Sequence, residues 1–377
     1  MYQYKIPSVG NLLADSLCSL GLFKLMLMVD PLIKVECNLG HYEMLRVKSR
    51  KKPQDFEEEI LRNLNDLVES EFVRQHLWFR INTGRGLKPA FEVLSDLLRK
   101  MSSFSLSAFE PIIKGGRKGP TGLETFYLSV LPVYGKGLER YDGGMAGESA
   151  RAKPEVIVSY MIGLAYYTVC LEEDGSRLHL ALIPPLGKHV DEKYLLTINR
   201  AIALYFTEEG RVYINGLKAL PKLTLPLAML AKLDLATIEL LHELYPPEIL
   251  VFDVERAGRK AAETSRLYER YNTAAILRFF LSLGEWMHHV KEYISSLINV
   301  RGYREVQGTE LSSLIDSILL RLTLAIINSD ADMLNGALFE TLRLKERVKE
   351  SLLKYIDRIN MLNNKATSAM VKSLLVK

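Results

Sequence analysis

The last third of this 377-residue chain has the pattern that most restricts its fold. From about Glu255 onward it contains no proline and few glycines, and apolar residues recur with the helical period through 264–300, 311–327 and from Met333 to near the end. Proline disrupts the interiors of helices and sheets alike, so a long proline-free stretch with this period favours helices. The pattern predicts a helical bundle over residues 256–377.

Residues 1–255 mix short helical and strand-like stretches separated by turns. Leucines and a phenylalanine at spacings of three to four from Leu12 to Phe23 predict a helix that follows a short extended start and ends before Pro31. Further helices are predicted at 55–71, 88–100, 192–206 and 233–244, strands at 32–37, 42–47, 124–132, 211–214 and 249–252, and a hairpin over 156–183 whose start can be helical. The predicted fold class is therefore α+β, with small antiparallel sheets and helices in region 1–255 and the helical bundle in 256–377.

The cysteine content favours a reducing compartment. Only Cys18, Cys37 and Cys170 occur, far apart and without a CxxC pair, so neither a disulfide framework nor a thiolate zinc site is expected. With 48% hydrophobic and 25% charged residues, the composition is that of a folded globular chain and not of a disordered one. We expect a cytoplasmic protein.

Two apolar stretches raise the question of a membrane. The first 30 residues contain Asp15 and Lys24 and lack the basic start and small-residue cleavage site of a signal peptide, so they are predicted to form a core helix. The run 156–171 is shorter than the roughly 20 residues that span a bilayer. We therefore expect no membrane partner.

The charge of the chain is unevenly distributed. Residues 256–377 contain 19 Lys+Arg and 13 Asp+Glu, a net charge of +6, whereas residues 1–255 contain 30 and 32, a net charge of −2. The whole positive excess therefore lies in the predicted bundle. An excess confined to one region favours an anionic partner there more than the total of +4 does.

A basic stripe is the strongest feature of this bundle. If the chain from Met333 onward forms one last helix, six basic side chains fall within a roughly 60° arc at about 100° per residue. They are Arg343, Arg347, Lys354, Arg358, Lys365 and Lys372, and the opposite face carries Leu344, Val348, Leu352, Tyr355, Ile356, Ile359 and Leu362. Such a row can neutralise phosphates along a strand, although a solvated helix face has the same pattern.

Basic residues also gather in four segments before residue 256. The densest segment contains Arg46, Lys48, Arg50, Lys51 and Lys52. It either contacts phosphate or is a solvated segment. Glycines around Lys114, Arg117 and Lys118 let backbone and side chains approach duplex phosphates, unless the loop is merely disordered. Arg85, and Lys136 and Arg140 between tyrosines, can bind single strands or base edges through cationic and stacking groups.

No recognisable active-site motif occurs. The patterns GxxxxGK[ST] and GxSxG are absent, as is GxGxxG after a convincing strand, so we expect no catalytic residue and no cofactor. His288 and His289, with Glu285 and Glu292 four residues from one or the other, are the only candidate metal cluster. Neighbouring Trp286, Met287 and Tyr293 indicate a partly packed helix and favour structural histidines with satisfied hydrogen bonds, and we expect no metal.

The order of elements resembles that of the large subunit of archaeal type I-A CRISPR effector complexes. The likeness begins at Pro7-Ser8-Val9-Gly10-Asn11, which leads into an apolar helix with Asp15 and Gly21, and continues through an α+β body with basic glycine loops to the helical bundle. It implies a subunit in antiviral defence that joins a guide-RNA-bound backbone, inspects duplex DNA flanking the target, helps to open it and recruits a separate helicase-nuclease.

The residues and the resemblance together predict a non-catalytic nucleic-acid-binding subunit of an RNA-guided interference complex. Its expected partners are double- and single-stranded DNA, guide RNA, the other protein subunits of the complex and the helicase-nuclease. Two alternatives stay open: a nuclease or other nucleic-acid enzyme with a divergent site, and a protein scaffold whose basic faces meet acidic partner surfaces.

Overall fold

Two structural units divide the chain, which crosses between them more than once. The computed structural model describes residues 1–9, 12–77, 80–82, 87–109, 113–114, 150–151, 153–173, 176–206, 208–254 and 269–375. The N-terminal unit comprises Met1–Ile202 and Leu250–Arg270, and the helical unit comprises Ala203–Ile249 and Tyr271–Lys377. Residues 203–249 thus belong to the helical unit, whereas they were predicted to belong to region 1–255. The predicted α+β fold class is confirmed.

The first sheet of the N-terminal unit has the order β1-β3-β2-β10 and is antiparallel throughout. Its strands are β1 (Tyr2–Pro7), β2 (Lys34–Asn38), β3 (Glu43–Ser49) and β10 (His189–Asp191). Side chains alternate along β3, because successive residues of a strand point to opposite faces. Leu45 and Val47 are buried, whereas Arg46 and Lys48 stay partly accessible on the other face.

The second sheet has the order β12-β11-β9-β8. Its strands are β8 (Thr168–Glu173), β9 (Ser176–Ile183), β11 (Glu248–Val254) and β12 (Glu269–Asn272), and two small ladders pair β4 (Arg80–Asn82) with β5 (Leu87–Pro89) and β6 (Ile113–Lys114) with β7 (Ala150–Arg151). Strands β8 and β9 form an antiparallel hairpin, which confirms that prediction. The strand predicted at 124–132 lies outside the described residues.

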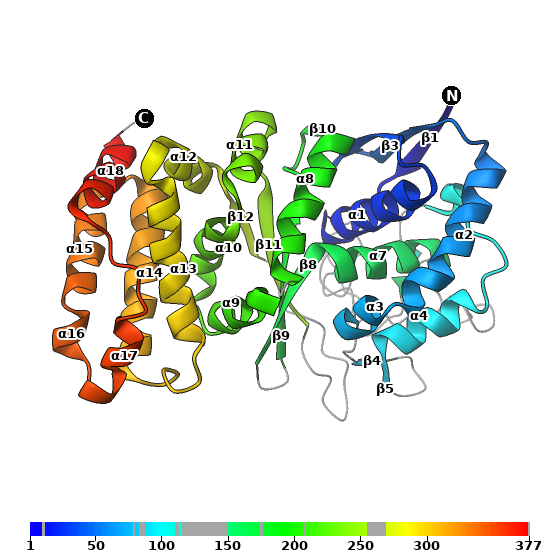
Figure 1. Ribbon diagram of the computed structural model, residues 1–377. Coiled ribbons are helices and arrows are strands. Elements are labelled where there is room, and N and C mark those ends of the chain that lie inside the picture. Colours follow the sequence, from blue (N-terminus) through cyan, green and yellow to red (C-terminus); the bar gives the residue numbers. More distant parts are fainter. Residues whose placement is uncertain are drawn as a thin grey trace. The chain divides into compact units, whose positions relative to one another are not determined.

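The helices of the N-terminal unit are built around one closely packed pair. They are α1 (Leu12–Val29), α2 (Pro53–Glu69), α3 (Glu71–His76), α4 (Ala90–Leu98), η1 (Leu106–Ala108), α7 (Pro154–Tyr167) and α8 (Glu192–Ala203). Helices α1 and α7 run side by side (Figure 1). They touch through Gly21 and Gly163, where an added Cβ would overlap with a carbonyl oxygen of the other helix.

Helix α1 is long and apolar enough to cross a membrane by length and composition, but 78% of that 18-residue stretch is buried inside the fold. Its one acidic residue, Asp15, is also buried and accepts hydrogen bonds of 2.7 Å from the Ser8 hydroxyl and the Val9 N–H. Asp15 thus fastens the connection from β1. The hydrophobicity of α1 is accounted for by packing, as the sequence predicted for a core helix.

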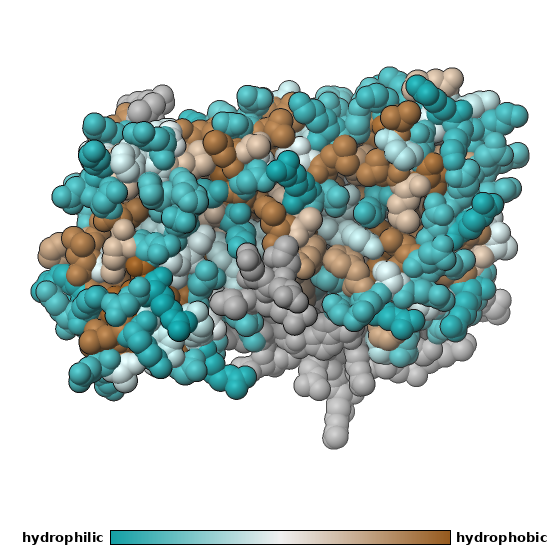
Figure 2. All heavy atoms as spheres, in the orientation of Figure 1, coloured by the Kyte–Doolittle hydropathy of each residue, from teal (hydrophilic) through white to brown (hydrophobic). Residues whose placement is uncertain are grey.

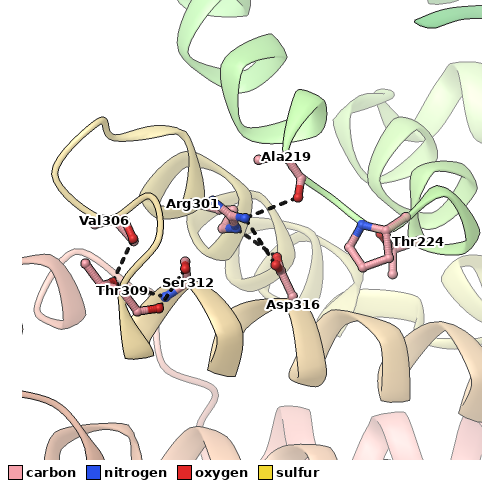
Figure 3. Close-up of polar contacts among 8 residues, drawn as sticks. Ala219, Thr224, Arg301, Val306, Thr309, Ser312 and Asp316 are labelled. Atoms are coloured by element: carbon pink, nitrogen blue, oxygen red, sulfur yellow. Dashed lines mark hydrogen bonds and ion pairs between the residues drawn. The ribbon is translucent and has the colours of Figure 1, made fainter. Parts of the chain in front are cut away.

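The helical unit begins with η3 (Leu204–Phe206), α9 (Glu208–Lys218), η4 (Lys222–Thr224), α10 (Leu225–Lys232) and α11 (Leu235–Leu244) and continues with α12 (Ala274–Ser282), η5 (Gly284–Trp286), α13 (Met287–Gly302), α14 (Glu310–Asn328) and α15 (Ala331–Leu342). Figure 1 shows α13, α14 and α15 running alongside one another. A partly buried ion pair joins α13 to α14. The Arg301 guanidinium donates at 2.8 Å and 3.1 Å to the Asp316 carboxylate and at 3.2 Å to the Ala219 carbonyl (Figure 3).

Three helix and strand predictions were wrong. Residues 211–214, predicted as a strand, lie in α9, where Tyr213 and Leu217 are both buried one turn apart and the Tyr213 hydroxyl donates to the Ala228 carbonyl. A short apolar run such as Val212–Ile214 fits both structures, and only a longer window reveals the helical period. Residues 269–272, which were predicted to belong to a helical stretch over 264–300, form strand β12 instead.

The third correction concerns the end of the chain, which is not one helix. After α15 come α16 (Leu344–Arg347), η6 (Glu350–Leu352), α17 (Leu353–Ile356) and α18 (Asn364–Leu375). The last break coincides with an asparagine-rich segment, in which the Asn363 side chain accepts a hydrogen bond of 2.8 Å from the Ala366 N–H. Asparagine competes with the helix by bonding to nearby backbone and favours a helix start.

Candidate nucleic-acid interface

The segment from Arg343 to Leu375 is the most consistently basic part of the helical unit. It contains eight basic and three acidic residues, a net charge of +5. Three of the cations are paired: Arg343 with Glu346 at 3.0 Å, Lys345 with Asp357 at 2.6 Å, and Lys349 with Glu310 at 3.7 Å. Within the described part of the chain the other five have no ion-pair partner: Arg347, Lys354, Arg358, Lys365 and Lys372. We call these five the unpaired basic group.

The unpaired basic group occupies three short helices and a connection instead of one helix face. Arg347 ends α16, Lys354 lies in α17, Arg358 follows α17, and Lys365 and Lys372 lie in α18. All five side chains are exposed. The apolar residues predicted opposite them do pack inward, since Leu344, Leu352, Tyr355, Ile356 and Ile359 are buried and Val348 and Leu362 are half-buried. The division into basic and apolar residues is confirmed, whereas the straight 60° stripe was wrong.

Two tyrosines hold part of this group in place. The Arg358 guanidinium lies 4.9 Å from the ring centroid of Tyr303 and 5.8 Å from that of Tyr355, and the Lys354 ammonium lies 4.9 Å from the Tyr355 ring. The two rings are 5.4 Å apart. An aromatic face stabilises a cation without neutralising it. The N–H donors of Arg358 and Lys354 are thus positioned but keep their full positive charge for an anion.

A pocket of about 520 Å³ lies beside Arg358. One wall is a single face of α13 and its end, and the other is the connection between α17 and α18; the lining residues are Glu292, Ser295, Ser296, Asn299, Val300, Tyr303, Arg358 and Asn360. The Ser296 hydroxyl donates to the Tyr293 carbonyl at 2.7 Å and accepts from the Asn360 N–H at 3.0 Å. This serine attaches the connection to α13 and so holds the two walls together.

The densely basic segment near β3 is largely neutralised by acidic neighbours. Arg46 contacts Glu43 at 2.7 Å and Glu36 at 3.3 Å, and Lys48 contacts Glu36 at 3.5 Å. Burial alone would raise the pKa of Glu43, but the hydrogen bond and charge of Arg46, with Lys5, lower it. A carboxylate held ionised in this way offsets the cations around it.

The three cations at the end of the same segment, Arg50, Lys51 and Lys52, are not all compensated by carboxylates. Lys51 lies 2.5 Å from Glu59 on α2, so it too is compensated. Arg50 and Lys52 are exposed and have no ion-pair partner among the described residues. A contact with phosphate at this sheet would therefore depend on these two residues and not on the whole predicted segment.

Of the remaining predicted contact residues before residue 256, only Lys114 falls within the described part of the chain. Arg85, Arg117, Lys118, Lys136 and Arg140 lie outside the described residues. The backbone of Lys114 belongs to β6 and pairs with Ala150 of β7. The glycine-rich loops thus remain predictions from the sequence alone.

The candidate metal cluster does not assemble. His288 Nε2 lies 3.2 Å from the Glu292 carboxylate, and His289 instead faces Trp286 with ring centroids 5.6 Å apart. In the part of the chain that the structure describes, no group of three or more His, Cys, Asp or Glu residues is arranged to hold a metal ion.

The structure reveals one cysteine–histidine pair that sequence reasoning missed. Cys170 and His179 are cross-strand neighbours in the β8–β9 hairpin, with Sγ 3.7 Å from Nε2, and the Thr168 hydroxyl lies 3.3 Å from Nδ1. The His179 ring is only 1% exposed and stacks on Phe252 at 5.2 Å. The feature that could have predicted this pair is the register of the hairpin, which places the two residues opposite each other. Because a substrate cannot reach the buried ring, we assign the pair to packing.

Sequence reasoning also missed Tyr303, Asn299 and Asn360 at the pocket. Tyr303 and Tyr355 are separated by 51 intervening residues, so no local spacing predicts that their rings meet. Comparison with known proteins adds no assignment, since no family model matches the chain and no curated protein matches its sequence.

Proposed function

We propose that this chain is a non-catalytic nucleic-acid-binding subunit of an RNA-guided CRISPR interference complex in the cytoplasm. The observation that carries the nucleic-acid part is the unpaired basic group, five exposed cations without a carboxylate partner within the described residues of a +5 segment. The assignment to an interference complex rests on the resemblance of the element order to the large subunit of type I-A effectors.

The physical basis is the release of counterions. Each phosphate neutralised by a lysine or arginine frees condensed cations, which makes affinity fall steeply with salt. A cation that is already paired with a carboxylate gains less free energy from binding a phosphate, because it must first give up that partner. The unpaired basic group is therefore suited to hold a target or displaced strand, more so than the compensated segment around Arg46 and Lys48.

Within such a complex, base pairing with the guide RNA supplies most of the sequence specificity, and the protein inspects a short flanking duplex. The basic segments of the N-terminal unit, Arg50 and Lys52 among them, would face this duplex or the end of the guide. Strand opening and recruitment of a separate helicase-nuclease would then follow from contacts with the other subunits.

A scaffold function has one observation of its own. Phe339 and Leu342 near the end of α15 are 58% and 72% exposed, and Arg343 lies over the Phe339 ring at 5.3 Å. In Figure 2, brown atoms interrupt the teal surface over the region that Figure 1 labels α15 and α16. Exposed apolar side chains beside an arginine are typical of protein contacts. This surface would suit a neighbouring subunit, with or without nucleic-acid binding by the same chain.

Neutralising the unpaired cations is expected to weaken nucleic-acid binding without unfolding the protein. In the triple variant Arg347→Gln, Lys354→Gln and Arg358→Gln, three phosphate contacts are lost, so the slope of log affinity against log salt on duplex DNA should become shallower by roughly 2.7, at about 0.9 per phosphate. Fluorescence anisotropy with labelled duplex and single-stranded DNA over a salt series measures this slope.

The same segment offers a matched control of equal charge change. In the triple variant Arg343→Gln, Lys345→Gln and Lys349→Gln, each altered residue is one that already has a carboxylate partner. We expect a clearly smaller change in slope. Equal effects of the two triples would show that only net charge matters, and absence of binding by the unaltered protein at low salt would leave the scaffold function as the better account.

A further inference from the structure

The pocket of the helical unit is lined by groups of different chemistry. Its lining includes the Glu292 carboxylate, which also lies 3.2 Å from His288 Nε2, and Arg358, whose guanidinium is held over Tyr303. It also includes Asn299 and Asn360, whose side-chain amides can both donate and accept hydrogen bonds. A ligand that fits this arrangement has a flat polar ring with donors and acceptors on its edge and an anion attached to one side.

A nucleotide has this chemistry. Its base edge pairs with side-chain amides and carboxylates, its face stacks on aromatic rings or a guanidinium plane, and its phosphate accepts hydrogen bonds from arginine. The pocket volume of about 520 Å³ lies within the range of roughly 300–1,000 Å³ that encloses small organic ligands. The walls are also fixed before binding, because Ser296 joins the Asn360 backbone to α13.

We propose that this pocket holds one unstacked nucleotide of a single strand, with the base between Asn299 and Asn360 and the adjacent phosphate on Arg358. The inference rests on the proposed function and deepens it, since it assigns a base as well as phosphates to the same site. Lys354 lies on the Tyr355 ring that adjoins Arg358, and it provides the contact for the next phosphate along the strand.

A base in the pocket distinguishes this proposal from phosphate binding alone. The full chain is titrated with a labelled ten-nucleotide thymidine strand and with an abasic strand of the same length and charge. Because stacking and edge contacts add to phosphate binding, we expect about tenfold tighter binding of the thymidine strand. Thymidine monophosphate serves as a competitor, to separate a free nucleotide from one within a strand.

A second experiment fills the pocket with a larger apolar side chain and leaves its charge unchanged. Asn299→Leu should bring the affinity for the thymidine strand down to that for the abasic strand and leave abasic binding unchanged. Arg358→Lys keeps the charge but removes the flat guanidinium that the proposal places on the phosphate, so it should weaken binding of both strands and leave the preference for thymidine. Asn335→Leu on the exposed face of α15 is the matched control and should change neither affinity. Circular dichroism melting of each variant confirms that it is folded.

The outcomes separate the two proposals. Equal binding of thymidine and abasic strands by the unaltered protein, or an Asn299→Leu variant that still prefers thymidine, overturns the pocket assignment and leaves the phosphate-binding function intact. Failure to bind either strand at low salt overturns both. Binding of an acidic peptide with the same Asn299→Leu sensitivity, in place of the thymidine strand, would assign the pocket to a protein partner.

Discussion

Replacing Gly163 by alanine is expected to lower the free energy of unfolding by about 3 kcal/mol, at the upper end of the usual cost of overpacking. The new Cβ would overlap with the Leu17 carbonyl of α1, and backbone atoms cannot move aside as a side chain can. Alanine raises intrinsic helix stability by about 1 kcal/mol, which is too little to offset the overlap. Urea denaturation followed by circular dichroism measures the change.

Gly336 provides the matched control, because it also lies inside a helix. A Cβ there would meet only the tip of the Arg321 side chain, at 3.3 Å, and that flexible group can shift. Gly336→Ala in α15 should therefore be neutral or stabilising by up to about 1 kcal/mol. Equal stability of Gly163→Ala and the unaltered protein would show that α1 and α7 are not in backbone contact.

Replacing Arg301 by methionine is expected to destabilise the helical unit by about 3 kcal/mol, since removal of one partner leaves the partly buried Asp316 carboxylate uncompensated. The Arg301 side chain is 10% exposed and satisfies both carboxylate oxygens of Asp316 as well as the Ala219 carbonyl (Figure 3). Methionine keeps the length of the aliphatic chain but has no donor for any of these oxygens. Thermal and urea unfolding measure the loss.

The pH dependence of this variant provides a specific test of the ion pair. Burial already raises the pKa of Asp316, and the Arg301 guanidinium opposes that effect. Without Arg301 the folded-state pKa rises further above its unfolded value, so the folded protein binds more protons between the two values. Stability of Arg301→Met should therefore be highest at acidic pH and fall as pH rises through this window.

A second substitution isolates the carboxylate. In the double variant Arg301→Met with Asp316→Asn no charge is left to titrate, so the added pH dependence should disappear and part of the lost stability should return. If the single and double variants had the same stability from pH 4 to pH 7, the uncompensated Asp316 would not be the cause of the loss.

Local patterns of the sequence predicted much of the secondary structure. The helical spacing from Leu12 to Phe23 became α1, the alternation at 42–47 became β3, and the turn after Leu171 became the β8–β9 hairpin. Each of these depends on residues within a few turns or strands of one another, where period and turn chemistry act directly. The breaks after α15 were missed because periodicity continued across them, although Asn363 capping was a local sign of the last one.

The sequence by itself determined that the chain is α+β, that its positive charge is concentrated near the C-terminus, and which residues of that segment are apolar and buried. Only the tertiary structure decided which cations remain available. Arg46, Lys48 and Lys51 meet Glu36, Glu43 and Glu59, whereas Arg347, Lys354 and Arg358 meet no carboxylate within the described residues. The physical reason is that periodicity reports which face of an element is buried, but charge compensation and the pocket beside Tyr303 depend on contacts between residues distant in the sequence.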